Sequence, residues 1–394
     1  MKYYINFLRD KPIIRSLSLV NFIASFGAWF STVAIYTMVV EFGSSEFAIA
    51  IVTAMHFIPA ILIAPFSGSL IDRLKIKPLM VTLLFIELSM TACFLLIETA
   101  SDLWLLLIFI FIRMSAASMF FSSEMSLLAK IATGKDLQTA NEIQSIIWSF
   151  TYAVGMALSG FIVNLYDVKA AILIDVAIFV LAFFVFLNIK INIEYKKVEE
   201  KILELMIDGL RYIKNNKIIL HLIFLHASVG LTSYDALITI LAKNEYKELI
   251  AVPLAIGLSN AVRAVALMIG PLFLNKIIKK ENLQYLLIFQ GITIIIWAFA
   301  QSNFYLSLGA LFFVGFSTAF LWSYTYALLQ NHCDKRYIGR VISYNDMFFI
   351  LANVLTTLFI GTMAHITTTS IITICLGVAF LFYAYYYTKI YSKI

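Results

Sequence analysis

Long apolar runs separated by short charged loops dominate this sequence. A run of about 20 apolar residues is long enough for an α-helix to cross a bilayer, and a helix satisfies its own backbone hydrogen bonds there. The composition agrees, because 62% of the 394 residues are hydrophobic and 13% are charged, whereas soluble domains are about 25% charged. We therefore predict an all-α integral membrane protein with twelve membrane-spanning helices. The predicted spans cover residues 14–40, 47–71, 78–98, 103–128, 143–165 and 169–189, then 218–242, 251–275, 283–301, 304–330, 341–364 and 369–388.

The positive charge of the chain is concentrated in alternate loops. Of the 29 lysines and arginines, 24 fall in the termini and in the loops on one side of the predicted spans. The opposite side holds Lys169, Lys243 and Lys247. Cytoplasmic loops of membrane proteins carry such an excess of positive charge. We therefore predict a multi-pass protein of the inner (plasma) membrane with both termini in the cytoplasm.

A long polar segment divides the spans into two groups of six. We predict an N-terminal half at 1–189, a cytoplasmic linker at 190–217 and a C-terminal half at 218–394. Apolar residues recur at helical spacing through 196–215, with charged residues on the opposite face. This pattern favours an amphipathic helix on the cytoplasmic membrane surface, and a solvated tether is the alternative.

The two predicted halves share residues at a nearly constant offset. Gly68 and Gly270 each end a second span, 202 positions apart, and Gly160 and Gly361, near the ends of the fifth spans, are 201 apart. Self-similarity at one offset indicates duplication. Two six-span repeats related by an axis along the membrane normal, with a substrate site between them near the midplane, are a known transporter plan.

The loop between spans two and three carries the sharpest local motif, GSLIDRLKIK over residues 68–77. It resembles the signature loop of the major facilitator superfamily, although Lys75 and Ile76 replace a glycine and an arginine of that pattern. The residues of this loop that match are Gly68, Leu70, Asp72, Arg73 and Lys77, of which Gly68, Asp72, Arg73 and Lys77 are the predicted gating residues. The resemblance implies that Asp72 contacts the cytoplasmic start of span eleven, near 339–342, when the transporter is open outward. An ordinary positively charged cytoplasmic loop is the alternative.

Four further segments resemble the macrolide-efflux and siderophore-exporter branch of drug:proton antiporters. These segments are 59–68, 137–141, 208–213 and 339–341. The branch's glycine–proline pair in span five is lost, since Met156 follows Gly155. The resemblance implies proton-coupled export of a small amphiphilic compound, drug-like or siderophore-like, by alternating access.

Ionisable residues inside spans are costly and usually functional. Asp235 and Arg263 lie on spans seven and eight at depths that differ by about 7 Å at 1.5 Å per residue, so an arginine side chain can join them. The pair is either a static structural contact or one that proton or substrate binding breaks. Asp346 on span eleven is the next candidate for proton coupling.

Arg113 lies near the middle of span four and is the expected contact for anionic groups on the substrate. Glu87 and Asp175 lie on spans three and six, which are peripheral in the resembled fold, so we expect them to stabilise packing or to lie near a lipid-facing groove. Three aromatic residues deep in spans one, five and ten are candidates for the wall of an amphiphile-binding cavity: Trp29, Tyr152 and Trp322.

The remaining patterns narrow the function classes. The sequence contains no glycine-rich phosphate-binding loop for ATP and no His or Cys spacing typical of a metal site. We expect no cofactor, no nucleic acid partner and no enzyme activity, and we expect a monomer whose partners are a small-molecule substrate, protons and lipid. A facilitator or importer of a nutrient, lysolipid or metal species stays open as an alternative, as does a non-transporting membrane receptor or enzyme.

Overall fold

The structure, a computed structural model, describes residues 2–191, 202–275, 277–334 and 336–393, and no side chain is described at 2, 64–69, 72–73, 202–203, 205 or 393. Within this part of the chain the regular structure is entirely helical. The first half of the sequence forms α1 (Lys2–Asp10), α2 (Pro12–Glu41), α3 (Glu46–Met55), α4 (Ile58–Arg73), α5 (Ile76–Cys93), α6 (Leu103–Ile131), α7 (Gly134–Leu165) and α8 (Val168–Leu187). The second half forms α9 (Ile202–Asn215), α10 (Lys217–Ala227), α11 (Asp235–Leu241), α12 (Val252–Leu274), α13 (Leu283–Ala300), α14 (Phe304–His332), α15 (Ile338–Met363) and α16 (Thr369–Ile390).

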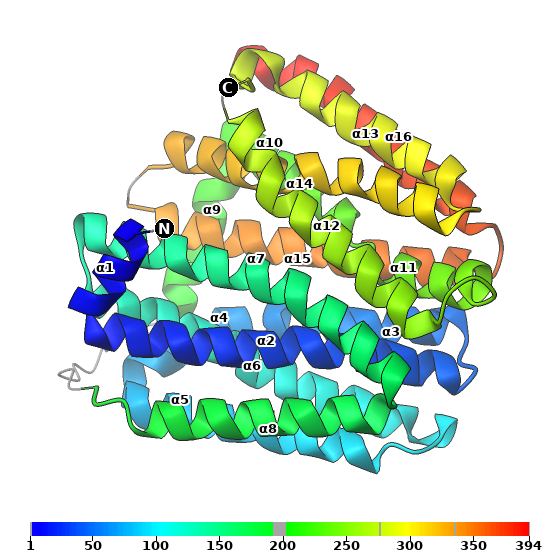
Figure 1. Cartoon of the computed structure of the whole chain (residues 1–394). Coiled ribbons are helices and arrows are strands. Elements are labelled where there is room, and N and C mark those ends of the chain that lie inside the picture. Colours follow the sequence, from blue (N-terminus) through cyan, green and yellow to red (C-terminus); the bar gives the residue numbers. More distant parts are fainter. Residues whose placement is uncertain (1, 192–201, 276, 335, 394) are drawn as a thin grey trace.

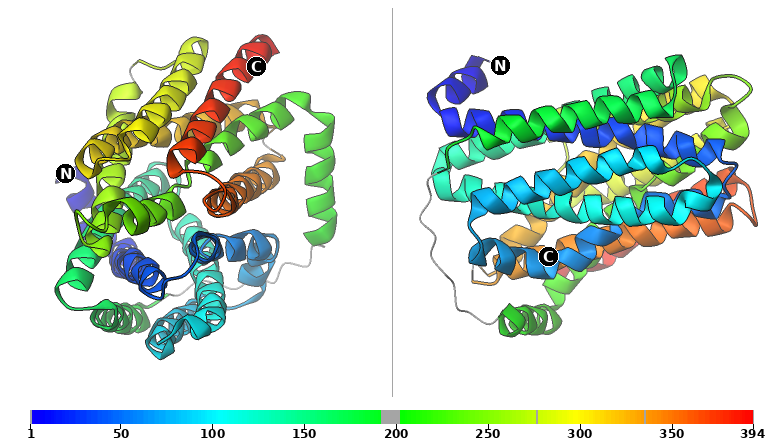
Figure 2. Two further views of the ribbon diagram at one scale, coloured as in Figure 1. Left: turned by 90° about the vertical axis from the view of Figure 1, so that its right-hand side faces the viewer. Right: turned by 90° about the horizontal axis from the view of Figure 1, so that it is seen from below.

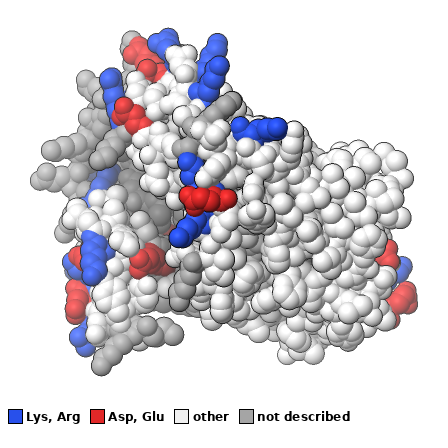
Figure 3. All heavy atoms as spheres, turned by 90° about the horizontal axis from the view of Figure 1, so that it is seen from above, with Lys and Arg blue, Asp and Glu red and all other residues white. Residues whose placement is uncertain are grey.

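Twelve helical segments of the described chain are long and apolar enough to cross a membrane, which confirms the predicted number of spans. They run alongside one another, and both chain termini lie at the same end of the bundle (Figure 1). We call this end the terminal end and the opposite one the far end. Charged side chains gather toward the ends and leave an uncharged expanse between them on the face drawn in Figure 3. The protein is therefore a multi-pass membrane protein.

The spans pack as two groups of six, as predicted for this fold class. In the first group α2 packs on α7 and α8, and α5 packs on α6 and α8; in the second, α12 packs on α14, and α13 packs on α14 and α16. The groups meet where α7 lies on α12 and where α3 and α4 lie on α15 (Figure 2). The boundaries proposed for the two halves and the linker stay predictions.

Glycines allow the closest approaches between the two groups. A methyl group at Gly160 on α7 would lie 2.6 Å from the carbonyl oxygen of Pro253 on α12. A methyl group at Gly361 on α15 would lie 2.2 Å from the Cβ of Ala50 on α3. These are the glycines that recur at one offset in the sequence, so the duplicated fifth span of each group packs tightly on a second span of the other group.

Polar contacts join the two groups at the far end. The Lys243 Nζ lies 3.0 Å from a carboxylate oxygen of Glu46 and donates to the carbonyl oxygen of Ser44 at 2.8 Å. The His365 Nδ1 lies 3.6 Å from the other Glu46 oxygen. Together with the glycine contacts, these bonds close the far end in this conformation.

Short helices dock at the terminal end of each group. The α1 helix lies against the start of α7, where Tyr3 and Thr139 share a 3.0 Å hydrogen bond and Tyr4 donates to Glu142 at 3.0 Å. The α9 helix crosses the ends of the spans (Figure 2) and lies against the start of α15.

An ion pair and a pair of stacked rings hold α9 against the protein. The Arg340 Nη1 lies 2.6 Å from an Asp208 oxygen, and the Tyr212 ring stacks on Tyr337 with centroids 4.3 Å apart. Gly209 faces Arg340 so closely that a methyl group there would lie 2.9 Å from the Arg340 Cβ. The first part of the predicted amphipathic segment, 196–201, lies outside the described residues, and the rest contacts the protein through this face.

Candidate functional site

Two spans are broken near the middle of the bundle. The second span ends its first helix at Met55 and begins the next at Ile58, with Pro59 in the first turn of the new helix. Proline has no backbone N–H to donate and is favoured at such a start. The seventh span passes through a 3-10 turn at Ser228–Thr232 before α11 begins at Asp235. Both regions were predicted as spans, at 47–71 and 218–242, and both are among the twelve candidate spans, but hydropathy did not reveal that they are interrupted.

The break in the seventh span is tightly packed. A methyl group at Gly230 would lie within 2.7 to 2.8 Å of the Ala352 Cβ, the Asn353 nitrogen and the Phe349 oxygen on α15. Ser233 shares a 2.8 Å hydrogen bond with Thr357. Irregular backbone at membrane depth is tolerated where protein groups satisfy it, and α15 supplies part of that support here.

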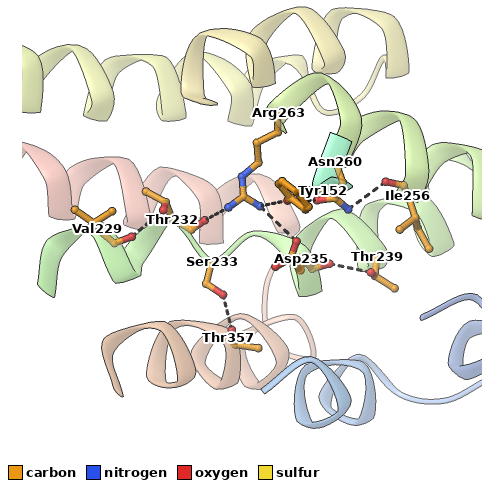
Figure 4. Close-up of polar contacts among 10 residues, drawn as sticks. All are labelled: Tyr152, Val229, Thr232, Ser233, Asp235, Thr239, Ile256, Asn260, Arg263 and Thr357. Carbon is orange, nitrogen blue, oxygen red and sulfur yellow. Dashed lines mark hydrogen bonds and ion pairs between the residues drawn. The ribbon is translucent and has the colours of Figure 1, made fainter. Parts of the chain in front are cut away.

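Arg263 joins the break to the rest of the site (Figure 4). Its Nη1 lies 3.4 Å from an Asp235 oxygen, and its Nη2 donates to the carbonyl oxygen of Thr232 at 2.9 Å. Nη1 also lies 3.4 Å from the hydroxyl of Tyr152, which in turn donates to Asn260 at 3.1 Å. Because Tyr152 belongs to α7, the network crosses the contact between the two groups of spans.

Arg113 has a partner that we did not predict. Its Nη2 lies 3.2 Å from an oxygen of Asp175 on α8, and its Nη1 donates to the Ser31 hydroxyl at 2.8 Å. The rings of Phe94 and Phe179 lie 5.5 and 5.0 Å from its Cζ. Asp175 is therefore not a peripheral packing residue: it neutralises the arginine at the centre of the first group.

One residue of each pair, Arg113 and Asp235, borders a small cavity. Its volume is about 90 Å³, below the roughly 300–1,000 Å³ of typical ligand pockets, so this cavity is too small for a drug-sized molecule. Trp29, a predicted wall residue, lines the cavity; Tyr152, another, is not part of the lining but lies beside Trp29 with ring centroids 4.6 Å apart. The cavity is lined by Ala28, Trp29, Thr32, Tyr36, His56, Phe57, Arg113, Met114, Met156 and Asp235.

Two predicted site residues lie elsewhere. Trp322 is not among the residues that line the cavity; it stacks on Tyr326 at 5.0 Å and lies 5.9 Å from the ring of His226. Asp346 accepts a 3.5 Å hydrogen bond from the same Tyr326. Hydropathy gives the depth of Trp322 in its span, but not the side of the helix on which it lies.

The gating loop is only partly described. The side chains of Gly68, Asp72 and Arg73 lie outside the described residues, so the predicted contact of Asp72 with α15 stays a prediction. Lys77 donates to the carbonyl oxygen of Leu187, the last residue of α8, at 3.0 Å. It therefore caps a helix of the first group.

One buried acid escaped the sequence reasoning. Glu124 on α6 is 1% exposed and accepts a 2.8 Å hydrogen bond from Gln144 on α7. The side-chain amide of Asn21 donates to Gln144, and Ser25 donates to Asn21 at 2.7 Å. The sequence signal that could have identified Glu124 is the presence of an acidic residue within the apolar run 103–128.

The fold and site define a class: a polytopic membrane transporter whose two groups of spans enclose a polar centre. A family model described as the Major Facilitator Superfamily matches residues 17–357. The chain belongs to this superfamily.

The chain is similar to one curated sequence relative and to solved structures with the same fold. The uncharacterized MFS-type transporter YfiS of Bacillus subtilis (strain 168) is 24% identical over 185 residues, which are 44% of this chain and 42% of that protein. The solved structure of the nucleoside transporter NupG has a TM-score of 0.76 at 12% identity and covers 96% of this chain and 99% of its own. A D-xylose-proton symporter has a TM-score of 0.72 at 13% identity, covering 94% and 97%. At these identities the solved structures show the fold alone.

Proposed function

We propose that the protein exports a small amphiphilic compound, drug-like or siderophore-like, by proton antiport with alternating access. The observation that carries the proposal is the Asp235–Arg263 pair, which lies at the contact of the two halves beside a cavity rich in aromatic and apolar side chains. When an ion pair at that position binds a proton, the contact between the two halves can change. The aromatic wall suits the apolar part of an amphiphile.

The pair gives the coupling a physical basis. A nearby arginine favours the ionised carboxylate of Asp235, whereas burial favours its protonated form. Asp235 and Arg263 both belong to the second half, so movement of the halves acts on the pair through Tyr152, which contacts Arg263 from the first half. Protonation on one side of the membrane and release on the other then follow from the same change of shape.

Substrate-driven proton movement in proteoliposomes tests this function. Candidate compounds are first selected by the rise in melting temperature that a ligand of the folded state produces. Proton movement opposite to the substrate supports antiport. Proton movement in the same direction as the substrate would instead support import by symport, and substrate movement without protons would support a facilitator.

Orientation follows from the charge distribution. We propose that the terminal end faces the cytoplasm, because 24 of the 29 lysines and arginines lie on that side of the spans. Single cysteines placed at 243–248 should react with an impermeant reagent in intact cells, whereas cysteines at 206–214 should react only after lysis. Labelling of the 206–214 positions from outside would reverse the orientation.

A further inference from the structure

We propose that Glu87, Asp175 and Arg113 form a proton-binding site inside the first half, in which the two carboxyl groups share one proton. The site lies on α5, α8 and α6, and it is separate from the Asp235–Arg263 pair on the second half. The inference rests on the proposed proton coupling and adds a second place where the coupled proton binds.

Asp175 has one oxygen free for a proton. Its side chain is 0% exposed, and one carboxylate oxygen is bound by Arg113 at 3.2 Å. The other oxygen, Oδ1, is buried and has no hydrogen-bond partner among the described residues. It faces the bare Cα of Gly27 on α2, where a methyl group would lie 2.4 Å away. A buried acceptor with no donor is expensive, and more so when it is charged, so a proton on the carboxyl group lowers that cost.

Glu87 gives the site more acids than cations. It is 4% exposed on α5 and makes no side-chain hydrogen bond within the described chain. It lies on α5, which packs on both α6 and α8, the helices that carry Arg113 and Asp175. One arginine neutralises one carboxylate, so a second ionised carboxylate would leave an unpaired buried charge, which proteins avoid. One proton on the two acids makes the site neutral.

The other groups that face the site do not alter this balance. Ser31 on α2 contributes a hydroxyl that accepts from Arg113. His56, in the turn between α3 and α4, lies near Arg113, whose positive charge disfavours a charged imidazolium, so it adds neither an anion nor a second cation. The described groups around the cluster therefore include no second cation that could pair with Glu87.

Arg113 connects the site to the cavity. The same guanidinium binds Asp175 and lines the space between the halves. When the shared proton leaves for water in the cavity, the site carries one negative charge and holds Arg113 more strongly. When the proton returns, that hold weakens, so the charge presented to the substrate depends on proton occupancy.

Infrared spectroscopy of the purified protein tests the proton directly and needs no substrate. At neutral pH the wild type should show the carbonyl stretch of a protonated buried carboxyl group that Glu87→Gln removes or shifts. Glu98→Gln is the matched control, because Glu98 is exposed on the surface and paired with Lys169. The band of Glu124 is identified with Glu124→Gln and subtracted. A spectrum unchanged by both Glu87→Gln and Asp175→Asn would overturn the proposal.

Transport separates this proposal from the proposed function. Glutamine imitates a permanently protonated Glu87, so Glu87→Gln should lower proton-driven transport at least about tenfold while substrate exchange persists. Proton-driven transport at the wild-type rate and pH dependence in Glu87→Gln would refute the second site and leave the proposed function intact. If the wild type moves no protons, the proposed function fails, and the infrared band still decides whether the site holds a proton.

Discussion

Replacing Asp235 with asparagine is expected to lower proton-driven transport about 100-fold, a typical size for a strong coupling between two sites. Asparagine keeps the shape of the side chain and an oxygen that can accept from Arg263, but it cannot take up and release a proton at working pH. Substrate counterflow needs no net proton movement, so it should persist in the same proteoliposomes. Measuring both activities in one preparation checks the prediction.

Asp346→Asn is the matched control for this experiment. Asp346 is also a half-buried acid of the second half, but it bonds to Tyr326 and lies outside the cavity lining. It should retain most proton-driven transport. Intact proton-driven transport in Asp235→Asn would make the Asp235–Arg263 pair a structural contact and would turn attention to Asp346.

Replacing Gly160 with alanine is expected to prevent the far end from closing. The added methyl group would lie 2.6 Å from a backbone oxygen of Pro253, and α12 also presents the bare Cα of Gly257 at 3.3 Å. Overpacking of this kind costs about 1–3 kcal/mol, which lowers the population of the closed conformation roughly 5- to 150-fold. Distances between spin labels on the far ends of α7 and α12 should lengthen, and transport should fall in proportion.

Gly309→Ala provides the control for the glycine effect. Gly309 lies on α14 and has no neighbouring atom within 4 Å of the position that a methyl group would take. Alanine favours helix over glycine by about 1 kcal/mol, so this variant should be at least as stable as the wild type and should transport normally. Unchanged far-end distances in Gly160→Ala would show that the two groups close by another contact.

Hydropathy predicts the spans of this chain well and misses their interruptions. The twelve runs are found because crossing a bilayer imposes a minimum length of apolar sequence. The turn at Ser228–Thr232 is not found, since the residues around it are apolar enough to read as one span. Its backbone is held by Arg263 and by α15, and those partners are distant in sequence.

For the candidate site too, the sequence indicates how deep a residue lies in its span but not the direction in which its side chain points. Counting residues from the span ends correctly indicated that Asp235 and Arg263 lie at compatible depths. Counting could not reveal that Arg113 turns toward Asp175, or that Trp322 turns away from Trp29, because rotation about a helix axis depends on neighbouring helices. Acidic residues inside apolar runs indicate buried polar sites as arginines do, as Glu124 shows.

The two docked helices occupy equivalent places in the two groups of spans. The α1 helix ends one residue short of α2, with Lys11 between Asp10 and Pro12, and α9 ends one residue short of α10, with Asn216 between Asn215 and Lys217. Each short helix rests on the start of the fifth span of its own group. Each docked helix therefore links the first span of its group to the fifth at the terminal end, so the two groups are held together internally in the same way.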